Sequence, residues 1–212
     1  MRSAPRSAPG FLLAADPPLV IASRNAGKLR EFRRLLAPYR WRLRSLDEAG
    51  FAAEMAEPGP GYAENARAKA DAVAAATGLA ALGDDSGIEV RALDDWPGPR
   101  SARWLGPGAT DAERAEGIRA ELRQRSAADR RCRYVAAVAM SRPGRPTVVV
   151  RGECEGELVA PSGDGGFGYD PVFLSADLGM RFAMASDDDK DRVSHRARAI
   201  AALAELGALG VR

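Results

Sequence analysis

The sequence has few of the residues that build soft-metal sites or covalent cross-links. Its 212 residues include two cysteines, Cys132 and Cys154, and one histidine, His195. Two thiols are too few for a disulfide framework or a four-thiolate zinc site, and one imidazole excludes sites built from several histidines. The cysteine count indicates a reducing, cytoplasmic setting. A metal ion that acts here must therefore be held by carboxylates, which favours Mg²⁺ or Mn²⁺.

The chain also lacks an excess of charge and a long apolar run. Lys and Arg total 31 against 29 Asp and Glu, a net charge of +2. No global field therefore draws the protein to nucleic acid, and any anion site must be local. No apolar run approaches the roughly 20 residues that span a bilayer, so we expect no membrane partner. With 46% hydrophobic residues the chain has enough apolar side chains for a globular core.

The first 18 residues differ in composition from the rest. They repeat Arg-Ser-Ala-Pro in tandem before a short apolar stretch. We interpret residues 1–18 as a flexible tail and residues 19–212 as one folded domain. An organelle-targeting peptide shares the Arg/Ser-rich, acid-poor composition, but Pro5 and Pro9 oppose the amphipathic helix that such a peptide forms.

Hydrophobic periodicity and turn residues predict an alternation of strands and helices. The expected strands, several of them short, are residues 19–22, 41–46, 79–82, 134–140, 147–153 and 172–174. The expected helices are residues 28–37, 62–76, 110–125 and 187–206. Residues 110–113, Thr-Asp-Ala-Glu, have the spacing of a capping box that starts the third helix, and Thr77-Gly78 should end the second. Residues 134–140 and 147–153 should form an antiparallel hairpin, and residues 94–109 an ordered loop. Residues 83–87, Gly-Asp-Asp-Ser-Gly, read as a polar segment in which a strand ends.

The first polar turn lies between a buried strand and a helix start. Backbone N–H groups and the positive end of the helix dipole converge at such a place, which suits phosphate. Ser23 and Asn25 can donate hydrogen bonds, and Lys28 adds a positive charge. The alternative is an ordinary solvated connection between a strand and a helix.

Two adjacent carboxylates, Asp84 and Asp85, stand between two glycines. Neighbouring negative charges of this kind repel unless a cation or proton compensates them. One carboxylate can bind Mg²⁺ while the other polarises a water for attack on phosphorus. Glu57 and Glu64, on either side of a predicted helix start, can complete the cluster. The alternative is an Asp-rich turn, with Glu64 placed by the helix dipole.

Two further segments can bind a base. Phe167 and Tyr169 offer stacking faces in a glycine-rich loop, although loop aromatics also serve to anchor loops to the core. Lys190, His195 and Arg196 bring hydrogen-bond donors to the last predicted helix. The alternative for this second group is a solvated helix face.

Taken in order, six segments resemble the inosine/xanthosine triphosphate pyrophosphatase family, which removes deaminated purine nucleotides. The resemblance covers nearly the whole chain from Leu19. The six segments are residues 23–28 (SRNAGK), 64–70 (ENARAKA), 84–87 (DDSG), 97–103 (PGPRSAR), 165–171 (GGFGYDP) and 194–196 (SHR).

The resemblance implies a fold, a reaction and an assembly. The fold is α/β, an elongated mixed β-sheet with flanking helices that form two lobes around a nucleotide cleft, and the active form is a homodimer. The reaction is attack on the α-phosphorus of ITP, dITP or XTP, which releases the monophosphate and pyrophosphate. A hydrogen-bond donor beside the purine 6-oxo group favours the binding of hypoxanthine and xanthine. It disfavours adenine, which carries an amine at that position.

The resemblance also implies roles for individual residues. Glu57 and Asp85 bind one Mg²⁺, for which Mn²⁺ can substitute, and Asp85 activates the attacking water, with Asp84 in support. The substrate-binding residues are Ser23, Arg24, Asn25, Lys28, Lys69, Ser86, Phe167, Gly168, Tyr169, Asp170, Lys190, His195 and Arg196. Phe167 stacks on the purine, and Arg196 approaches its 6-oxo group.

Some segments depart from the family's pattern. Residues 103–106 read Arg-Trp-Leu-Gly where a tyrosine-containing turn is usual, and residues 54–61 match most loosely. Glu54 therefore stays open as the metal ligand in place of Glu57. A nucleotide sensor that does not cleave is a second interpretation, opposed by the intact Asp84 and Asp85 pair. A nucleic-acid-binding protein is a third, opposed by the balanced charge and the scattered arginines.

Overall fold

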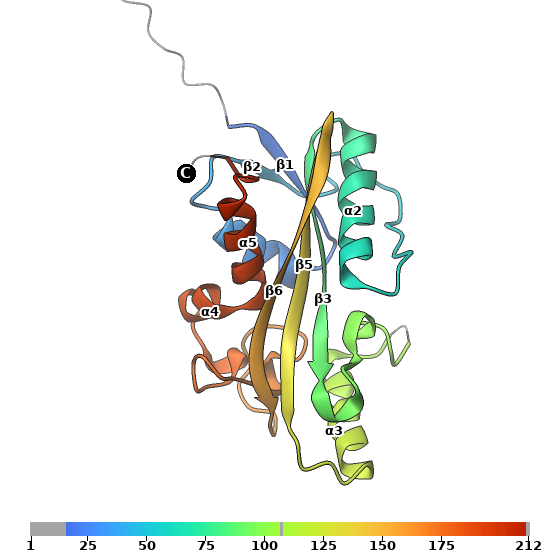
Figure 1. The fold of residues 1–212 in the computed structure, drawn as a ribbon, viewed down its shortest axis with the longest axis vertical. Coiled ribbons are helices and arrows are strands. Elements are labelled where there is room, and N and C mark those ends of the chain that lie inside the picture. The colour runs from blue at the N-terminus through green and yellow to red at the C-terminus, as the bar shows by residue number, and fades with distance from the viewer. Residues whose placement is uncertain (1–15, 107, 211–212) are drawn as a thin grey trace, which may run out of the picture.

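The computed structural model describes residues 16–106 and 108–210. Most of the tail predicted for residues 1–18 lies outside the described residues, and Pro18 already belongs to the first strand. The described part of the chain forms an elongated mixed sheet with helices on both faces (Figure 1). No helix in the described ranges is long and apolar enough to cross a membrane.

One mixed sheet organises the described residues. Its strands follow the order β2-β1-β3-β5-β6-β7, and β4 pairs with β3 off this path. β1 runs parallel to β2 and β3, and the remaining pairs are antiparallel. The strands are β1 (Pro18–Ala22), β2 (Arg42–Arg44), β3 (Ala80–Val90), β4 (Trp96–Pro97), β5 (Arg131–Arg142), β6 (Arg145–Leu158) and β7 (Phe173–Ser175). The predicted hairpin is confirmed as β5 and β6.

Five α-helices occur in the described ranges, and short 3₁₀ turns join several elements. The α-helices are α1 (Ala26–Leu35), α2 (Tyr62–Thr77), α3 (Asp111–Gln124), α4 (Asp187–Val193) and α5 (His195–Glu205). The 3₁₀ turns are η1 (Arg91–Leu93), η2 (Gly98–Arg100), η3 (Asp170–Val172) and η4 (Phe182–Met184). α2 lies on one face of the sheet and α5 on the other (Figure 1). The capping box predicted at Thr110 is present, and Gly78 ends α2 in a left-handed conformation.

The core follows the two-residue alternation of the strands. On β5, Ala137 and Ala139 pack against α2, whereas Ala136 and Val138 pack on the opposite face with α1 and α5. Successive side chains of a strand point to opposite faces, so one strand serves both layers. The same alternation places the adjacent residues Asp84 and Asp85 of β3 on opposite faces of the sheet.

The structure corrects the prediction that a strand ends before residues 83–87. These residues lie inside β3, which is continuous from Ala80 to Val90. The glycines permit close packing here, and they do not form a turn. A Cβ at Gly83 would lie 2.2 Å from the carbonyl oxygen of Ala66 on α2, and one at Gly87 would lie 2.2 Å from that of Gly98.

The last predicted helix is also corrected, because it is two helices. Ser194 adopts an extended conformation between α4 and α5, and its hydroxyl accepts a hydrogen bond from the N–H of Ala197. Serine is a strong N-cap residue because its side chain satisfies a free backbone donor of the next helix. The break turns His195 and Arg196 into the first residues of α5.

A gap in the sheet positions the candidate site. One edge of β3 pairs with β1 at residues 80–83 and with β4 at residues 89–90. Between them, residues 84–88 meet no strand of the described chain on that edge. Ser101, just after η2, partly fills the gap, since its hydroxyl accepts a hydrogen bond from the N–H of Ile88 at 2.8 Å.

Candidate functional site

The turn between β1 and α1 enters the gap beside β3. The side chain of Asn25 caps α1 by accepting a hydrogen bond from the N–H of Lys28 at 3.0 Å. The hydroxyl of Ser23 accepts one from the N–H of Asn25 at 3.2 Å. The Nζ atom of Lys28 lies 2.6 Å from a carboxylate oxygen of Asp84. The turn thus places a helix N-terminus and a cation together at the end of a parallel strand, as phosphate binding requires.

Asp84 and Asp85 point to opposite faces of β3 and not into one carboxylate cluster, and a cation compensates each charge, as expected for neighbouring carboxylates. Asp84 meets Lys28 and, at 3.5 Å, Nε of Arg196. Asp85 meets Lys69 at 2.9 Å on the α2 face and accepts a hydrogen bond from Asn65 at 3.1 Å. Each carboxylate therefore has its own cation, and the alternation of the strand keeps the two apart.

The two aspartates also differ in their protonation equilibria. Burial opposes the ionisation of Asp84, but Lys28 and Arg196 outweigh it, and its pKa lies below the usual range. At Asp85, burial outweighs Lys69 and Asn65 and raises the pKa. A carboxylate with a raised pKa is the stronger base, so Asp85 is better suited than Asp84 to accept a proton near neutral pH.

Glu57 and Asp85 together offer oxygens for a hard cation. An oxygen of Glu57 lies 2.5 Å from Nζ of Lys69, the same atom that contacts Asp85. The other oxygen of Glu57 pairs with Arg103. Glu54 and Glu64 are exposed and have no ion pair among the described residues. The geometry therefore favours Glu57 over Glu54 as the partner of Asp85.

The carboxylates of Glu57 and Asp85 suit the coordination that Mg²⁺ prefers in proteins. The described ranges hold no cluster of three or more His, Cys, Asp or Glu side chains able to bind a metal ion. Mg²⁺ commonly takes only one or two protein carboxylates and completes its shell with water and phosphate oxygens. Glu57 and Asp85 converge on a point where positive charge is already stabilised, so the pair suits such a mixed shell.

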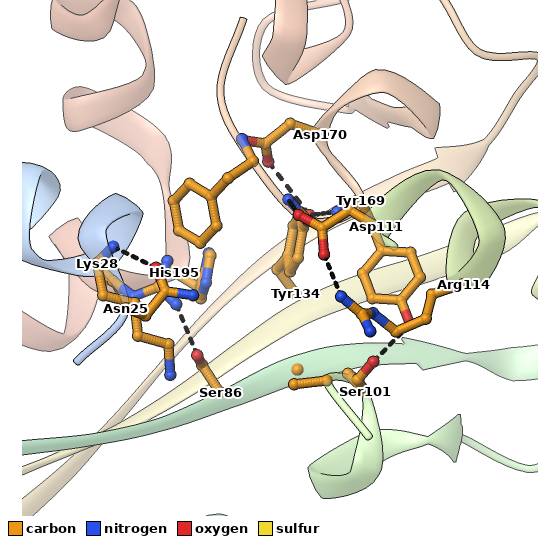
Figure 2. A pocket seen from close by; sticks show the side chains of 15 residues that line it. Asn25, Lys28, Ser86, Ser101, Asp111, Arg114, Tyr134, Tyr169, Asp170 and His195 are labelled. Carbon is orange, nitrogen blue, oxygen red and sulfur yellow. Dashed lines mark hydrogen bonds and ion pairs between the residues drawn. The ribbon is translucent and has the colours of Figure 1, made fainter. Parts of the chain in front are cut away.

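A cavity of about 90 Å³ lies on the other face of β3. Figure 2 shows Asn25 and Lys28 at one side, Arg114 and Tyr169 at the other, and Ser86 on the strand. The predicted substrate-binding residues in its lining are Asn25, Lys28, Ser86, Phe167, Gly168, Tyr169, Asp170, His195 and Arg196. The remaining predicted ones, Ser23, Arg24, Lys69 and Lys190, are not in the lining.

Arg24 turns away from the cavity. Its guanidinium pairs with Asp47 at 3.3 Å and donates to backbone carbonyls of residues 51–53. In this structure Arg24 therefore holds the loop that precedes Glu57.

Phe167 forms one wall of the cavity and leans on the start of α1. A Cβ at Gly27 would lie 2.5 Å from the Phe167 ring, so only glycine allows this approach. Nζ of Lys190 lies 5.1 Å from the ring centroid, and Cζ of Arg196 lies 5.4 Å from it. The ring thus meets two cations, which attract its π face.

Arg196 and Lys190 are buried, so the alternative of a solvated helix face is wrong. Both cations are held by Glu31 of α1, at 2.8 Å from Arg196 and 2.7 Å from Lys190. Lys190 also pairs with Asp170 at 2.6 Å, and Arg196 donates to the hydroxyl of Ser86 at 2.6 Å. Burial opposes the ionisation of Glu31, but Arg196 and Lys190 outweigh it and lower its pKa.

His195 has free ring nitrogens beside this network. Its ring stacks on Tyr134 with centroids 4.6 Å apart, and neither nitrogen has a hydrogen-bond partner within the described part of the chain. Burial, together with Arg196, Lys190 and Lys28, lowers its pKa far below the usual value, so the imidazole is neutral. A neutral imidazole can donate one hydrogen bond and accept one, which suits a base edge.

Four residues shape the site without a sequence pattern that marks them as functional. Glu31 looked like one more polar residue of an amphipathic helix. Tyr134 was counted only as a strand residue, yet its hydroxyl donates to Asp170 at 3.2 Å and accepts from the N–H of Tyr169 at 3.1 Å. Asp111 was placed only by its helix-capping position, but it also accepts a hydrogen bond from the N–H of Gly168 at 2.7 Å. The fourth, Arg114, lines the cavity, and nothing in the sequence signalled it.

Known proteins include relatives that match most of this chain. The sequence profile of the Ham1 family matches residues 19–206. A dITP/XTP pyrophosphatase of Symbiobacterium thermophilum is 46% identical over 184 residues, which cover 86% of this chain and 91% of that protein.

Solved structures give the same result. A HAM1 protein from Coxiella burnetii superposes with a TM-score of 0.80 at 33% identity, covering 90% of this chain and 98% of that one. A nucleoside-triphosphatase, dITP/XTP pyrophosphatase, from Mycobacterium abscessus gives a TM-score of 0.70 at 38% identity and covers 88% and 98%. The family resemblance read from the sequence is confirmed, and the chain belongs to the Ham1 family.

Proposed function

We propose that the protein hydrolyses non-canonical purine nucleoside triphosphates, namely ITP, dITP and XTP, to the monophosphate and pyrophosphate. Relatives that match most of the chain are dITP/XTP pyrophosphatases. The observation that carries the proposal is the division of β3. On one face Asp85 and Glu57 both contact Nζ of Lys69, and on the other Ser86 accepts a hydrogen bond from Arg196.

Glu57 and Asp85 hold one Mg²⁺, and Mn²⁺ can substitute for it. When bound, the ion neutralises charge on the triphosphate and polarises its phosphoryl oxygens. Lys28 and Lys69 add positive charge on either face of β3, and the capped start of α1 at Asn25 offers backbone N–H groups. The hydroxyl of Ser23 stabilises this turn by accepting a hydrogen bond from the N–H of Asn25, and Arg24 ties the turn to the loop that precedes Glu57.

Asp85 accepts the proton of the attacking water. The water oxygen forms a bond to the α-phosphorus while the bond from that phosphorus to the bridging oxygen breaks, and pyrophosphate leaves with the electron pair. Asn65 donates a hydrogen bond to one oxygen of Asp85 and so holds the carboxylate in place. A positioned general base contributes about 10²- to 10⁴-fold to such a step.

The purine occupies the cavity on the opposite face, stacked on Phe167. Arg196 and His195 read its 6-oxo group, and Glu31, which Arg196 shares with Lys190, holds the guanidinium in place. An adenine amine would face donors there and leave buried polar groups unpaired, which costs orders of magnitude in rate. Tyr169, Gly168 and Asp170 complete the pocket.

The proposal extends to the setting of the enzyme. We place the nucleotide in a cleft between two lobes of a single domain that begins at residue 19, and we place the enzyme as a homodimer in the cytoplasm. Its substrates are small molecules, with no nucleic acid or membrane as partner. There it removes deaminated purines from the nucleotide pool.

The decisive experiment incubates the protein with Mg²⁺ and ITP, dITP, XTP, GTP or ATP in separate reactions and identifies the products by anion-exchange chromatography. We expect inosine and xanthosine monophosphates with one pyrophosphate each, and far slower turnover of ATP. Release of orthophosphate, or equal rates with all five nucleotides, would contradict the proposal.

A further inference from the structure

The hydroxyl of Tyr169 ties the purine pocket to the turn of residues 101–104. It donates a hydrogen bond to the carbonyl oxygen of Ser101 at 2.7 Å and accepts one from Nε1 of Trp104 at 3.0 Å. Burial raises the pKa of Tyr169 to about 12, so the phenol keeps the proton that this arrangement needs. Both partners of the hydroxyl belong to one short turn.

Neighbouring groups hold the Trp104 ring in one orientation relative to Tyr169. Its ring packs edge-on against Trp96, with centroids 4.6 Å apart and an interplanar angle of 68°. On α3, a Cβ at Gly117 would lie 2.5 Å from the Trp104 ring, so the helix approaches as closely as glycine permits. The indole N–H therefore points at Tyr169 from a packed aromatic ring.

The same turn reaches the metal-ligand side of β3. Arg103, the residue before Trp104, pairs with Glu57. Ser101, which accepts the hydrogen bond from Tyr169, is also anchored to β3 through the N–H of Ile88. A displacement of Tyr169 is thus transmitted over very few bonds to the guanidinium that neutralises Glu57.

We propose that Trp104 is a positioning residue that couples occupation of the purine pocket to the availability of Glu57 for the metal ion. This inference rests on the proposed function and adds a regulation of the same site. A purine that seats against Tyr169 shifts Trp104 together with the 101–104 turn and draws Arg103 from Glu57, which frees for the cation the oxygen that Lys69 does not hold. A poorly seated purine leaves Glu57 paired with Arg103.

Because of this coupling, the selectivity between purine bases should affect kcat as well as the affinity for the nucleotide. Two ligands that favour the same conformation raise each other's affinity by the same factor. Purine binding and divalent-ion binding should therefore be synergistic. Selection by such induced fit lowers kcat for the wrong base, because the catalytic site is not assembled.

The test compares Trp104→Phe with Trp96→Phe. Phenylalanine at 104 keeps a ring between Trp96 and Gly117 but lacks the N–H donor. Trp96 is the other ring of the same pair, and no hydrogen bond of its indole is found among the described residues, so its replacement controls for lost aromatic contact. Free Mn²⁺ is measured by electron paramagnetic resonance with and without the uncleavable analogue α,β-methylene-ITP.

In the wild-type protein the analogue should tighten Mn²⁺ binding. Trp104→Phe should reduce this increase in Mn²⁺ affinity about fivefold, which corresponds to the contribution of one neutral hydrogen bond. It should also lower kcat for ITP by a similar factor with little change in KM. Trp96→Phe should leave the enhancement unchanged. Equal effects of the two variants, or an enhancement that survives Trp104→Phe, would overturn the proposal.

A double-mutant cycle tests whether Trp104 acts through Tyr169. In a Tyr169→Phe background, Trp104→Phe should have no further effect on the Mn²⁺ enhancement, because the shared hydroxyl is gone. Additive effects would show that Trp104 acts elsewhere, against the proposal. Mn²⁺ binding is measured without turnover, so a wild-type protein that cleaves no nucleotide would overturn the proposed function while the titration still decides the coupling.

Discussion

Replacing Glu31 with glutamine tests the idea that one buried carboxylate organises the purine-reading side of the site. Glu31 is 4% exposed, and its two oxygens meet Lys190 at 2.7 Å and Arg196 at 2.8 Å. Glutamine has nearly the same shape and can still accept a hydrogen bond with its amide oxygen. The substitution therefore removes the charge and leaves the packing almost intact.

The magnitude follows from the charges that stay behind. Three cations and three anions make up the buried network, namely Lys28, Lys190, Arg196, Glu31, Asp84 and Asp170. After the substitution three cations face two anions. Breaking a buried pair costs about 3–5 kcal/mol, and the retained amide oxygen places our expectation at the lower end, about 3 kcal/mol. For a chain of this size that lowers Tm by roughly 6–12 °C.

Urea unfolding followed by circular dichroism measures the change in the free energy of unfolding. The pKa of Glu31 is lowered in the folded protein, so its contribution is complete above the unfolded-state pKa, about 4.3. The contribution is lost as the pH falls through the lower folded-state value. The deficit of the variant should therefore be full at pH 7 and shrink only in strong acid.

The matched control is Glu205→Gln, at the exposed end of α5. A surface change of this kind should stay within about 0.5 kcal/mol of wild type. If Glu31→Gln were equally mild at pH 7, the electrostatic reasoning about this network would be refuted.

Three further predictions concern activity. Asp85→Asn should retain nucleotide binding in a calorimeter while kcat falls about 10²- to 10⁴-fold. In the metal-free wild type, an NMR titration of the Asp85 carboxyl should give a pKa above about 3.9, the usual Asp value, because burial raises it; a lower value would contradict this assignment of its environment. Arg196→Lys keeps the positive charge but loses the planar guanidinium with its paired N–H donors, so the ITP-to-ATP ratio of kcat/KM should fall about tenfold. Equal losses of kcat/KM on both nucleotides would mean that Arg196 does not distinguish the bases. Gly27→Ala should displace Phe167 and raise KM for ITP about tenfold, and an unchanged KM would argue against stacking on this ring.

Local patterns predicted most of the secondary structure, because each pattern has a local physical cause. Apolar spacing identified α1, the capping box fixed the start of α3, and Gly78 ended α2 as expected. The strand end expected before residues 83–87 and the single helix expected over residues 187–206 were both wrong. They share one origin, because one residue type can serve more than one structural purpose. Glycine and aspartate are typical of turns, but in β3 the glycines admit neighbouring backbone. Ser194 is an N-cap inside a polar run, where serine has no distinctive sequence signal.

The site was harder to predict than the fold, because burial of a charge depends on distant partners. Glu31 alternates with arginines on α1, a pattern shared by solvated faces, and its partners lie more than 150 residues away. The family resemblance supplied Arg196 and Lys190, yet no pattern in the sequence pointed to the anion between them. Tyr134 was missed because the partners of its hydroxyl, Asp170 and the N–H of Tyr169, are also far away in the sequence. Arg114 pairs locally with Asp111, and a local ion pair on a helix does not indicate a cavity.

The alternation of β3 explains how adjacent aspartates can serve two parts of one reaction. Asp84 faces Lys28 and Arg196, which joins the phosphate turn to the purine-reading donors. Asp85 faces Lys69 on the other side, where Glu57 completes the carboxylate pair. Because β3 pairs with β5 from Ala81 to Val90, the strand is held rigidly along the whole site. A shift of one residue in this pairing would exchange the two faces. In the mechanism that we propose, the register of β3 against β5 thus sets where the attacked phosphorus lies relative to the purine.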